Sequence, residues 1–142
     1  MLKKIKPIRL VVDTNLWISF LISKRLVALD KLLYSNKILF LFCEELINEV
    51  QVTITKLKLR KYFSDADNAL EEMLVTFDPY IQFVEVKSHV TVCRDNADNF
   101  LLALSKDGKA DFLVTGDKDL LSIRKFEKTN IITFNDFTRI SL

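Results

Sequence analysis

Hydrophobic and polar positions along this chain alternate between two periods. Short apolar runs rich in Ile, Val, Leu and Phe lie at residues 8–12, 38–42, 81–86, 112–115 and 131–134. Short, mostly apolar runs of this length are typical of β-strands with at least one buried face. Between them, apolar residues recur every three or four positions, which is typical of amphipathic helices. The predicted helical segments are residues 13–21, about 26–34, 44–56, 64–77 with a cap at Ser64–Asp67, 97–106, 118–123, and a last turn from Asn135.

The order of these elements predicts the fold class. Strands and helices alternate almost throughout, which favours an α/β protein built as a three-layer α/β/α sandwich with a mainly parallel sheet of four to five strands. The 142 residues are 49% hydrophobic, enough for one core, and include only 2 Gly and 2 Pro. We therefore expect a single domain over residues 1–142 with no linker.

Charge and cysteine content bear on the binding partners and the cellular compartment of the protein. The formal net charge is +2, which neither demands nor excludes a polyanionic partner. Cys43 and Cys93 are far apart and form no C-x-x-C motif, which favours reduced thiols over a disulfide or a zinc site. No apolar run reaches the roughly 20 residues that a membrane span needs. The sequence thus predicts a cytoplasmic protein with no membrane partner.

Four acidic residues fall where an α/β sheet would hold a ligand. Asp13 and Asp117 each follow a predicted strand, and ligands of open α/β sheets bind at the carboxyl ends of the strands. Glu49 lies beside the apolar side of its helix, and Asp98 falls in the first turn of another. If the strands before Asp13 and Asp117 are neighbours, these side chains can meet in one crevice.

Each acid taken alone also has a structural explanation. Asp13 and Asp117 can cap the helices that follow them, and Asp98 can complement a helix dipole with Asp95 or Asn96 as the cap. Glu49 can lie at a solvated helix edge. As a group, unneutralised carboxylates would repel one another, and a hard cation would remove that cost. An all-oxygen site without thiolate or imidazole suits Mg²⁺ or Mn²⁺.

Several motifs together resemble a known family, the PIN-domain ribonucleases. The chain is most similar to their branch of toxin components of toxin–antitoxin pairs, relatives of the VapC toxins, from about Arg9 to Phe137. The run T-G-D-K-D-L-L is quite specific, whereas D-T-N is weak by itself. The motifs are Val11-Val12-Asp13-Thr14-Asn15, Glu45-Leu46-Ile47-Asn48-Glu49-Val50, Asp95-Asn96-Ala97-Asp98-Asn99 and Leu113-Val114-Thr115-Gly116-Asp117-Lys118-Asp119-Leu120-Leu121.

The resemblance implies a metal-dependent endoribonuclease that cleaves RNA by Mg²⁺- or Mn²⁺-assisted phosphodiester hydrolysis. It also implies a cognate antitoxin as partner, and it leaves a homodimer open. In the third motif many members carry Pro-Asp where this chain has Asn96-Ala97, so the choice between Asp95 and Asp98 stays open, with Asp98 preferred. The implied catalytic and metal-binding residues are Asp13, Glu49, Asp98 and Asp117, and the implied auxiliary residues are Asp95, Asp119, Asn15 and Thr115.

A basic segment follows the helix that carries Glu49. Lys56, Lys58, Arg60 and Lys61, with Tyr62 and Phe63 beside them, could contact RNA phosphates and stack on bases. A solvated helix end with cations at its favourable terminus explains the same residues. The single histidine, His89, excludes a metal-free two-histidine ribonuclease within one chain, and we interpret it as a surface residue.

Other classes of protein remain as alternatives. One is a catalytically inactive PIN-like module that binds RNA or protein, although none of the four acids is missing. Another is an Asp-based phosphohydrolase or a receiver-like domain, which also places an Asp after the first strand. The phosphohydrolase pattern usually has a second Asp two positions later, where this chain has Asn15. Metal-dependent cleavage of RNA is therefore the favoured hypothesis.

Overall fold

Six strands form one sheet in the computed structural model, which describes residues 6–23, 38–58 and 66–140. The strand order is β3-β2-β1-β4-β6-β5. All neighbours pair in parallel except β5 and β6. The strands are β1 (Ile8–Val12), β2 (Ile38–Phe42), β3 (Ile81–Phe83), β4 (Phe112–Val114), β5 (Lys125–Phe126) and β6 (Thr129–Ile132).

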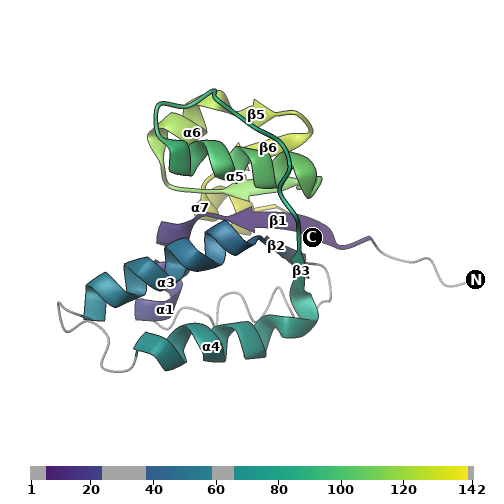
Figure 1. The fold of residues 1–142 in the computed structure, drawn as a ribbon. Coiled ribbons are helices and arrows are strands. Elements are labelled where there is room, and N and C mark those ends of the chain that lie inside the picture. The colour runs from purple at the N-terminus through teal and green to yellow at the C-terminus, as the bar shows by residue number, and fades with distance from the viewer. Residues whose placement is uncertain (1–5, 24–37, 59–65, 141–142) are drawn as a thin grey trace, which may run out of the picture.

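Helices cover both faces of this sheet, which confirms the predicted α/β class. Figure 1 shows α5 and α6 above the sheet and α1, α3 and α4 below it. Phe134 of α7 lies 5.0 Å from Phe20 of α1, measured between ring centroids, so α7 begins beside α1. The helices are α1 (Thr14–Ser23), α3 (Glu44–Lys58), α4 (Ala66–Phe77), the 3₁₀ turn η1 (Asp78–Tyr80), α5 (Asn96–Asp107), α6 (Lys118–Ile123) and α7 (Phe134–Thr138).

The pairing of β1 with β4 positions the acidic residues. Val12 lies opposite Val114 in the parallel register. The next amide, Asp13 N–H, donates to the Val114 carbonyl at 3.1 Å. Asp13 and Thr115 therefore leave the sheet side by side at the same edge, although they are far apart in sequence.

Aromatic packing beneath β2 holds α1 against the sheet. Trp17 is buried, and its ring centroid lies 5.0 Å from that of Phe40 and 5.2 Å from that of Phe42. Burying aromatic side chains of this size dominates core energetics. Trp17 and Phe20 are both buried in the core, and Trp17 lies one helical turn after Asp13, so this packing also fixes the start of α1.

The sheet differs from the sequence prediction at its margins. Six strands replace the expected four to five, because the two-residue β5 shows no alternation that a pattern could reveal. The predicted strand 81–86 ends at Phe83. Its last link to the sheet is the Val84 amide, which donates to the Phe42 carbonyl at 2.8 Å, where β2 ends. The chain beyond has no strand to pair with.

The predicted strand 131–134 is shifted toward the N-terminus. It is observed as Thr129–Ile132, because Thr133 caps α7 by accepting a hydrogen bond from the Asp136 amide at 3.1 Å. The predicted helix 26–34 and the Ser64–Asp65 part of the predicted cap lie outside the described residues. No described helix is long and apolar enough to cross a membrane.

Candidate functional site

A hollow of about 140 Å³ lies at the carboxyl ends of the parallel strands, beside β1 and β4. We call it the acidic cavity. It brings together all four acids predicted to bind metal, along with Asp95 and Asn15 from the auxiliary set. Its walls are formed by Asp13, Thr14, Asn15, Glu49, Thr53, Asp95, Ala97, Asp98, Leu101 and Asp117.

Asp13 is the most constrained of these carboxylates. It is buried, and its Oδ1 accepts a hydrogen bond from the Leu16 amide at 2.8 Å. Its Oδ2 accepts a short hydrogen bond from the buried Thr115 hydroxyl. Asp13 thus caps the start of α1 and also borders the cavity, so its structural and functional explanations are compatible.

Glu49 reaches the cavity from α3. It is half-buried, and its Oε2 accepts a hydrogen bond from the Thr14 hydroxyl at 2.8 Å. A carboxylate beside the apolar side of a helix needs such a partner, because burying an unpaired charge is costly. The Thr14 contact joins the start of α1 to α3 and orients Glu49 toward Asp13.

Asp95 and Asp98 play different parts at the start of α5. Asp95 is exposed and is the N-cap residue, and its Oδ1 accepts from the Ala97 amide at 3.0 Å. Asp98 is 7% exposed and has no hydrogen bond recorded to its carboxylate within the described residues. Asp98 is buried at the cavity wall whereas Asp95 is exposed, and this difference favours Asp98 over Asp95 as the third principal acid.

Asp117 and Asp119 enter from α6. Asp117 is the N-cap residue of α6, and its Oδ1 accepts from the Asp119 and Leu120 amides at 2.8 and 3.3 Å. The Asp117 amide donates to the Thr115 hydroxyl at 3.0 Å. Asp119 is exposed and forms an ion pair with Arg94, with the Nη2 and Oδ2 atoms 3.2 Å apart. Through its hydroxyl, Thr115 therefore links Asp13 at the end of β1 to Asp117 after the end of β4.

Burial and mutual repulsion both disfavour negative charge here. Burial, and after it the negative charges of Asp117, Asp95, Asp119 and Asp13, together raise the pKa of Asp98 from 3.8 to about 6. The pKa of Asp13 is also raised, mainly by burial, although the hydrogen bonds from Thr115 and Leu16 oppose the shift. A bound cation would relieve both effects.

The donor set fits a hard divalent cation. One carboxylate oxygen from each of Asp98, Asp117 and Asp119 lies within 4.8 Å of the other two. Asp13 and Glu49 line the same hollow from the opposite side. All of these donors are oxygens, which Mg²⁺, Ca²⁺ and Mn²⁺ prefer over the thiolates and imidazoles that select other metals. Asp119, predicted as auxiliary, thus lies within the same 4.8 Å limit of Asp98 and Asp117.

Other described residues singled out in the sequence do not line this cavity, although Cys93 lies near enough to Asp98 for that negative charge to raise its pKa. Cys43 and Cys93 are free thiols, and burial raises the pKa of both, that of Cys43 to about 11. His89 is exposed and borders a different hollow. Lys56 is exposed near the end of α3, whereas Arg60, Lys61, Tyr62 and Phe63 lie outside the described residues. Lys58 ends α3.

Sequence reasoning missed three supporting residues. Thr14 was interpreted only as a helix-start residue, yet it holds Glu49. Thr53 lies one turn after Glu49 and borders the cavity, with its hydroxyl donating back to the Glu49 carbonyl at 2.8 Å. Arg94 pairs with Asp119 across two segments. Only Thr14 carried a sequence signal, because it stands between two polar residues directly after a strand.

A family comparison agrees with this geometry. Residues 9–119 match the PIN domain family, so the chain belongs to that family. PIN domains are generally metal-dependent nucleases that bind divalent metals through acidic residues. The matched range contains every acid that lines the acidic cavity.

A relative extends the likeness over nearly the whole chain. The chain is 34% identical over 137 residues to the uncharacterized protein MJ1680 of Methanocaldococcus jannaschii, and the match covers 92% of this chain and 86% of that protein. The shared length includes the strands and helices that carry the acidic cavity. The branch of toxins within the family is a separate question, which neither comparison addresses.

Proposed function

We propose that this protein is an endoribonuclease that hydrolyses RNA phosphodiester bonds with Mg²⁺ or Mn²⁺. The observation that carries the proposal is the convergence of Asp13, Asp98 and Asp117 in one small cavity in which negative charge is disfavoured. Asp13, Glu49, Asp98 and Asp117 would hold the ion, with Asp119 within reach. When bound, such an ion neutralises phosphate charge and activates water.

The residues of the chain have distinct parts in this scheme. Thr115 fixes Asp13 and Asp117 relative to each other through its hydroxyl, and Thr14 fixes Glu49. Asp13, Asp117 and Glu49 are thereby oriented before the substrate arrives, which is how a supported site limits reorganisation. Arg94, paired with Asp119 at the rim, is placed to meet an incoming phosphate. Asn15, exposed at the cavity wall, can donate an amide hydrogen to the substrate.

The test measures the rate of RNA cleavage by the Asp117→Asn variant, with Asp136→Asn as the matched control. Asparagine keeps the acceptor oxygen that caps α6 but removes one charge from the cavity. We expect at least about a 100-fold loss of Mn²⁺-stimulated cleavage, because outer-shell changes alone cost 10- to 100-fold. Asp136 is exposed in the first turn of α7 at the same sheet edge but outside the cavity, so its variant should cleave normally.

Circular dichroism must first establish that both variants fold. Cleavage at the wild-type rate by folded Asp117→Asn would remove this residue from the mechanism. If the wild-type protein binds RNA but cleaves none with either metal, the catalytically inactive binding module becomes the better explanation. A chelator should abolish cleavage by the wild type.

We further propose that the protein acts as the toxin component of a toxin–antitoxin pair in the cytoplasm, with a protein antitoxin as partner. The support is the resemblance of its motifs to the VapC-related branch, together with two free cysteines. The two variants used above also test this role in cells. Wild type and Asp136→Asn should arrest growth when expressed alone, and Asp117→Asn should not. A homodimer is compatible with this role.

A further inference from the structure

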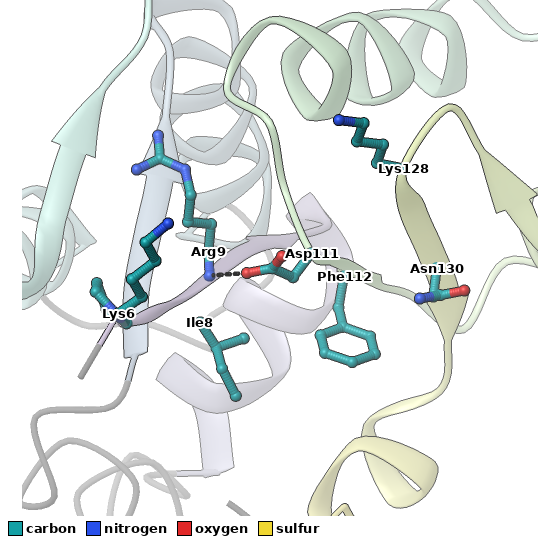
Figure 2. A pocket seen from close by; sticks show the side chains of 8 residues that line it. Lys6, Ile8, Arg9, Asp111, Phe112, Lys128 and Asn130 are labelled. Atoms are coloured by element: carbon teal, nitrogen blue, oxygen red, sulfur yellow. Dashed lines mark hydrogen bonds between the residues drawn. The ribbon is translucent and has the colours of Figure 1, made fainter. Parts of the chain in front are cut away.

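The sheet has a second polar edge, opposite the acidic cavity, where β1, β4 and β6 begin. Two hollows of about 540 and 300 Å³ lie there and share Asp111 and Lys128. Figure 2 shows Lys6 and Lys128 on opposite sides of the larger hollow, with Asp111 between them. We call this surface the basic edge. Its cations are Lys6, Arg9, Lys106, Lys109 and Lys128.

The acids of the basic edge are already engaged. Asp111 Oδ2 accepts a hydrogen bond from the Arg9 amide at 2.8 Å, drawn as the dashed line in Figure 2. Glu127 pairs with Lys106 at 3.8 Å. Against these two acids stand five cations, so the basic edge has an excess of positive charge.

Arg9 is committed to the fold, whereas three lysines are not. The Arg9 guanidinium donates to the Gly108 carbonyl at 2.8 Å and to Gln82 Oε1 at 3.0 Å. Lys6, Lys109 and Lys128 are exposed, and no ion pair or side-chain hydrogen bond is recorded for them within the described residues. They come from three different segments and surround open hollows, so they form a surface of uncompensated positive charge.

The acidic cavity by itself is unfavourable for binding a polyanion such as RNA. Five carboxylates line that cavity, from Asp13, Glu49, Asp95, Asp98 and Asp117, and they repel a polyanion. Affinity for a nucleic acid comes largely from lysine and arginine contacts to phosphates. The site of cleavage proposed above therefore cannot supply most of the affinity for its own substrate.

We propose that the basic edge binds phosphates of the RNA strand at a position removed from the bond that is cleaved. This inference rests on the proposed function. An RNA strand fits better than a small anion, because the lysines are spread over two adjoining hollows that one phosphate group cannot fill. Lysine is well suited to this role as a compact charge on a flexible stem.

The spacing of the two edges determines which property this contact affects. β1 has five residues, so at about 3.3 Å per residue the edges lie roughly 16 Å apart. The lysines therefore cannot touch the reacting phosphate. Removing them should weaken RNA binding and raise KM, while kcat at saturating RNA stays unchanged.

The experiment measures RNA affinity against salt concentration in the presence of a chelator, so that no cleavage occurs. The variant is Lys6→Gln/Lys109→Gln/Lys128→Gln, and its matched control is Lys6→Arg/Lys109→Arg/Lys128→Arg. The glutamine variant should flatten the slope of log K against log salt by about 2, since each lost phosphate contact on single-stranded RNA contributes about 0.7. The arginine variant should keep the wild-type slope.

Two results would overturn the inference. One is a glutamine variant with the wild-type slope. The other is a site for small anions, in which inorganic phosphate alone raises the melting temperature of the wild type but not of the glutamine variant, while RNA binding is the same in both. Because a chelator is present, the result is independent of catalysis. RNA binding that depends on the lysines without any metal-dependent cleavage would contradict only the proposed function.

Discussion

The two ends of the parallel strands differ in the sign of their charges and in how firmly the charged side chains are held. At the carboxyl ends, Asp13 and Asp98 are buried, and Asp13 is held by hydrogen bonds from both sides. At the opposite ends, Lys6 and Lys128 are exposed and unrestrained by any recorded partner among the described residues. Carboxylates that must share a metal need fixed positions, whereas lysines that attract phosphates gain from reach and mobility.

The two edges also differ in their effect on the stability of the folded protein. Negative charge at the acidic cavity is disfavoured by burial and repulsion, so that cavity is a source of instability without a cation. The lysines of the basic edge are solvated and cost little. Mutations in the acidic cavity should therefore change the stability of the protein and its response to metal. Mutations at the basic edge should change the salt-dependent affinity for RNA.

The largest effect that separates the edges is expected from Thr115→Val. Valine keeps the shape but removes the hydroxyl that donates to Asp13 and accepts from the Asp117 amide. We expect a loss of about 10-fold or more in metal affinity, the usual scale for groups that orient ligands. The rise in melting temperature on adding Mn²⁺ measures it. Thr115→Ser should restore most of that rise.

RNA affinity in chelator is the control for this variant. It should be unchanged in Thr115→Val, because the basic edge lies at the other end of the strands. If RNA affinity fell as much as metal affinity, the two edges would not be independent. A full Mn²⁺ response in folded Thr115→Val would show that the hydroxyl does not position the metal ligands.

A smaller effect is expected in the pH dependence of stability without metal. The raised pKa of Asp98 means that the folded protein keeps a proton that the unfolded chain loses, between about pH 4 and pH 6. The stability contributed by this group is thus present below that window and is lost as pH rises through it. Asp98→Asn removes this loss, so above pH 6 it should melt about 3 °C or more above the wild type.

Thermal melts in chelator at several pH values measure this difference. The gap in melting temperature between Asp98→Asn and wild type should widen from pH 4 to pH 6 and then stay constant. Asp136→Asn, an exposed acid outside the cavity, should show no such trend. A gap that does not change with pH would mean that the Asp98 carboxylate is not under the strain inferred from its surroundings.

The smallest effect concerns Lys56, from the segment predicted to contact RNA. It is exposed near the end of α3, three positions after Thr53, the last residue of this helix that lines the cavity. Lys56→Gln should flatten the salt dependence of RNA binding by no more than about 0.7, the contribution of one phosphate contact. The same measurement on Lys128→Gln gives the comparison. A larger change for Lys56 would move the main RNA contact from the basic edge to α3.

The sequence predicted the sheet centre better than its margins. The strands before Asp13 and Asp117 are largely buried and apolar, so the sequence pattern marks both, and the β1–β4 pairing makes them neighbours, as the meeting of the two acids requires. The third strand was predicted too long, because an alternating pattern persists after Phe83 where no partner strand exists. The spacing of apolar residues in a sequence indicates which face of a strand is buried. It does not indicate whether a neighbouring strand is present to form hydrogen bonds.

The gathering of the four acids followed from where each lies on its element, and the cavity contains all of them. Their roles remain predictions. The basic edge could not be predicted as a unit, because Lys6 lies 103 positions before Lys109 and Lys109 lies 19 positions before Lys128, and none lies in a motif. Charges that are brought together only by chain reversal leave no local pattern in a sequence.

The hydrogen bond between Thr115 and Asp13 spans 102 positions of the chain, and this span has a consequence for synthesis. Asp13 leaves the ribosome early, but the strand that completes its surroundings emerges only near the end of translation, at about 5–20 residues per second. Long-range pairing of this kind also forms slowly. A nascent chain therefore carries its first acid for several seconds without a partner, and the acidic cavity stays incomplete until nearly the whole protein has been made.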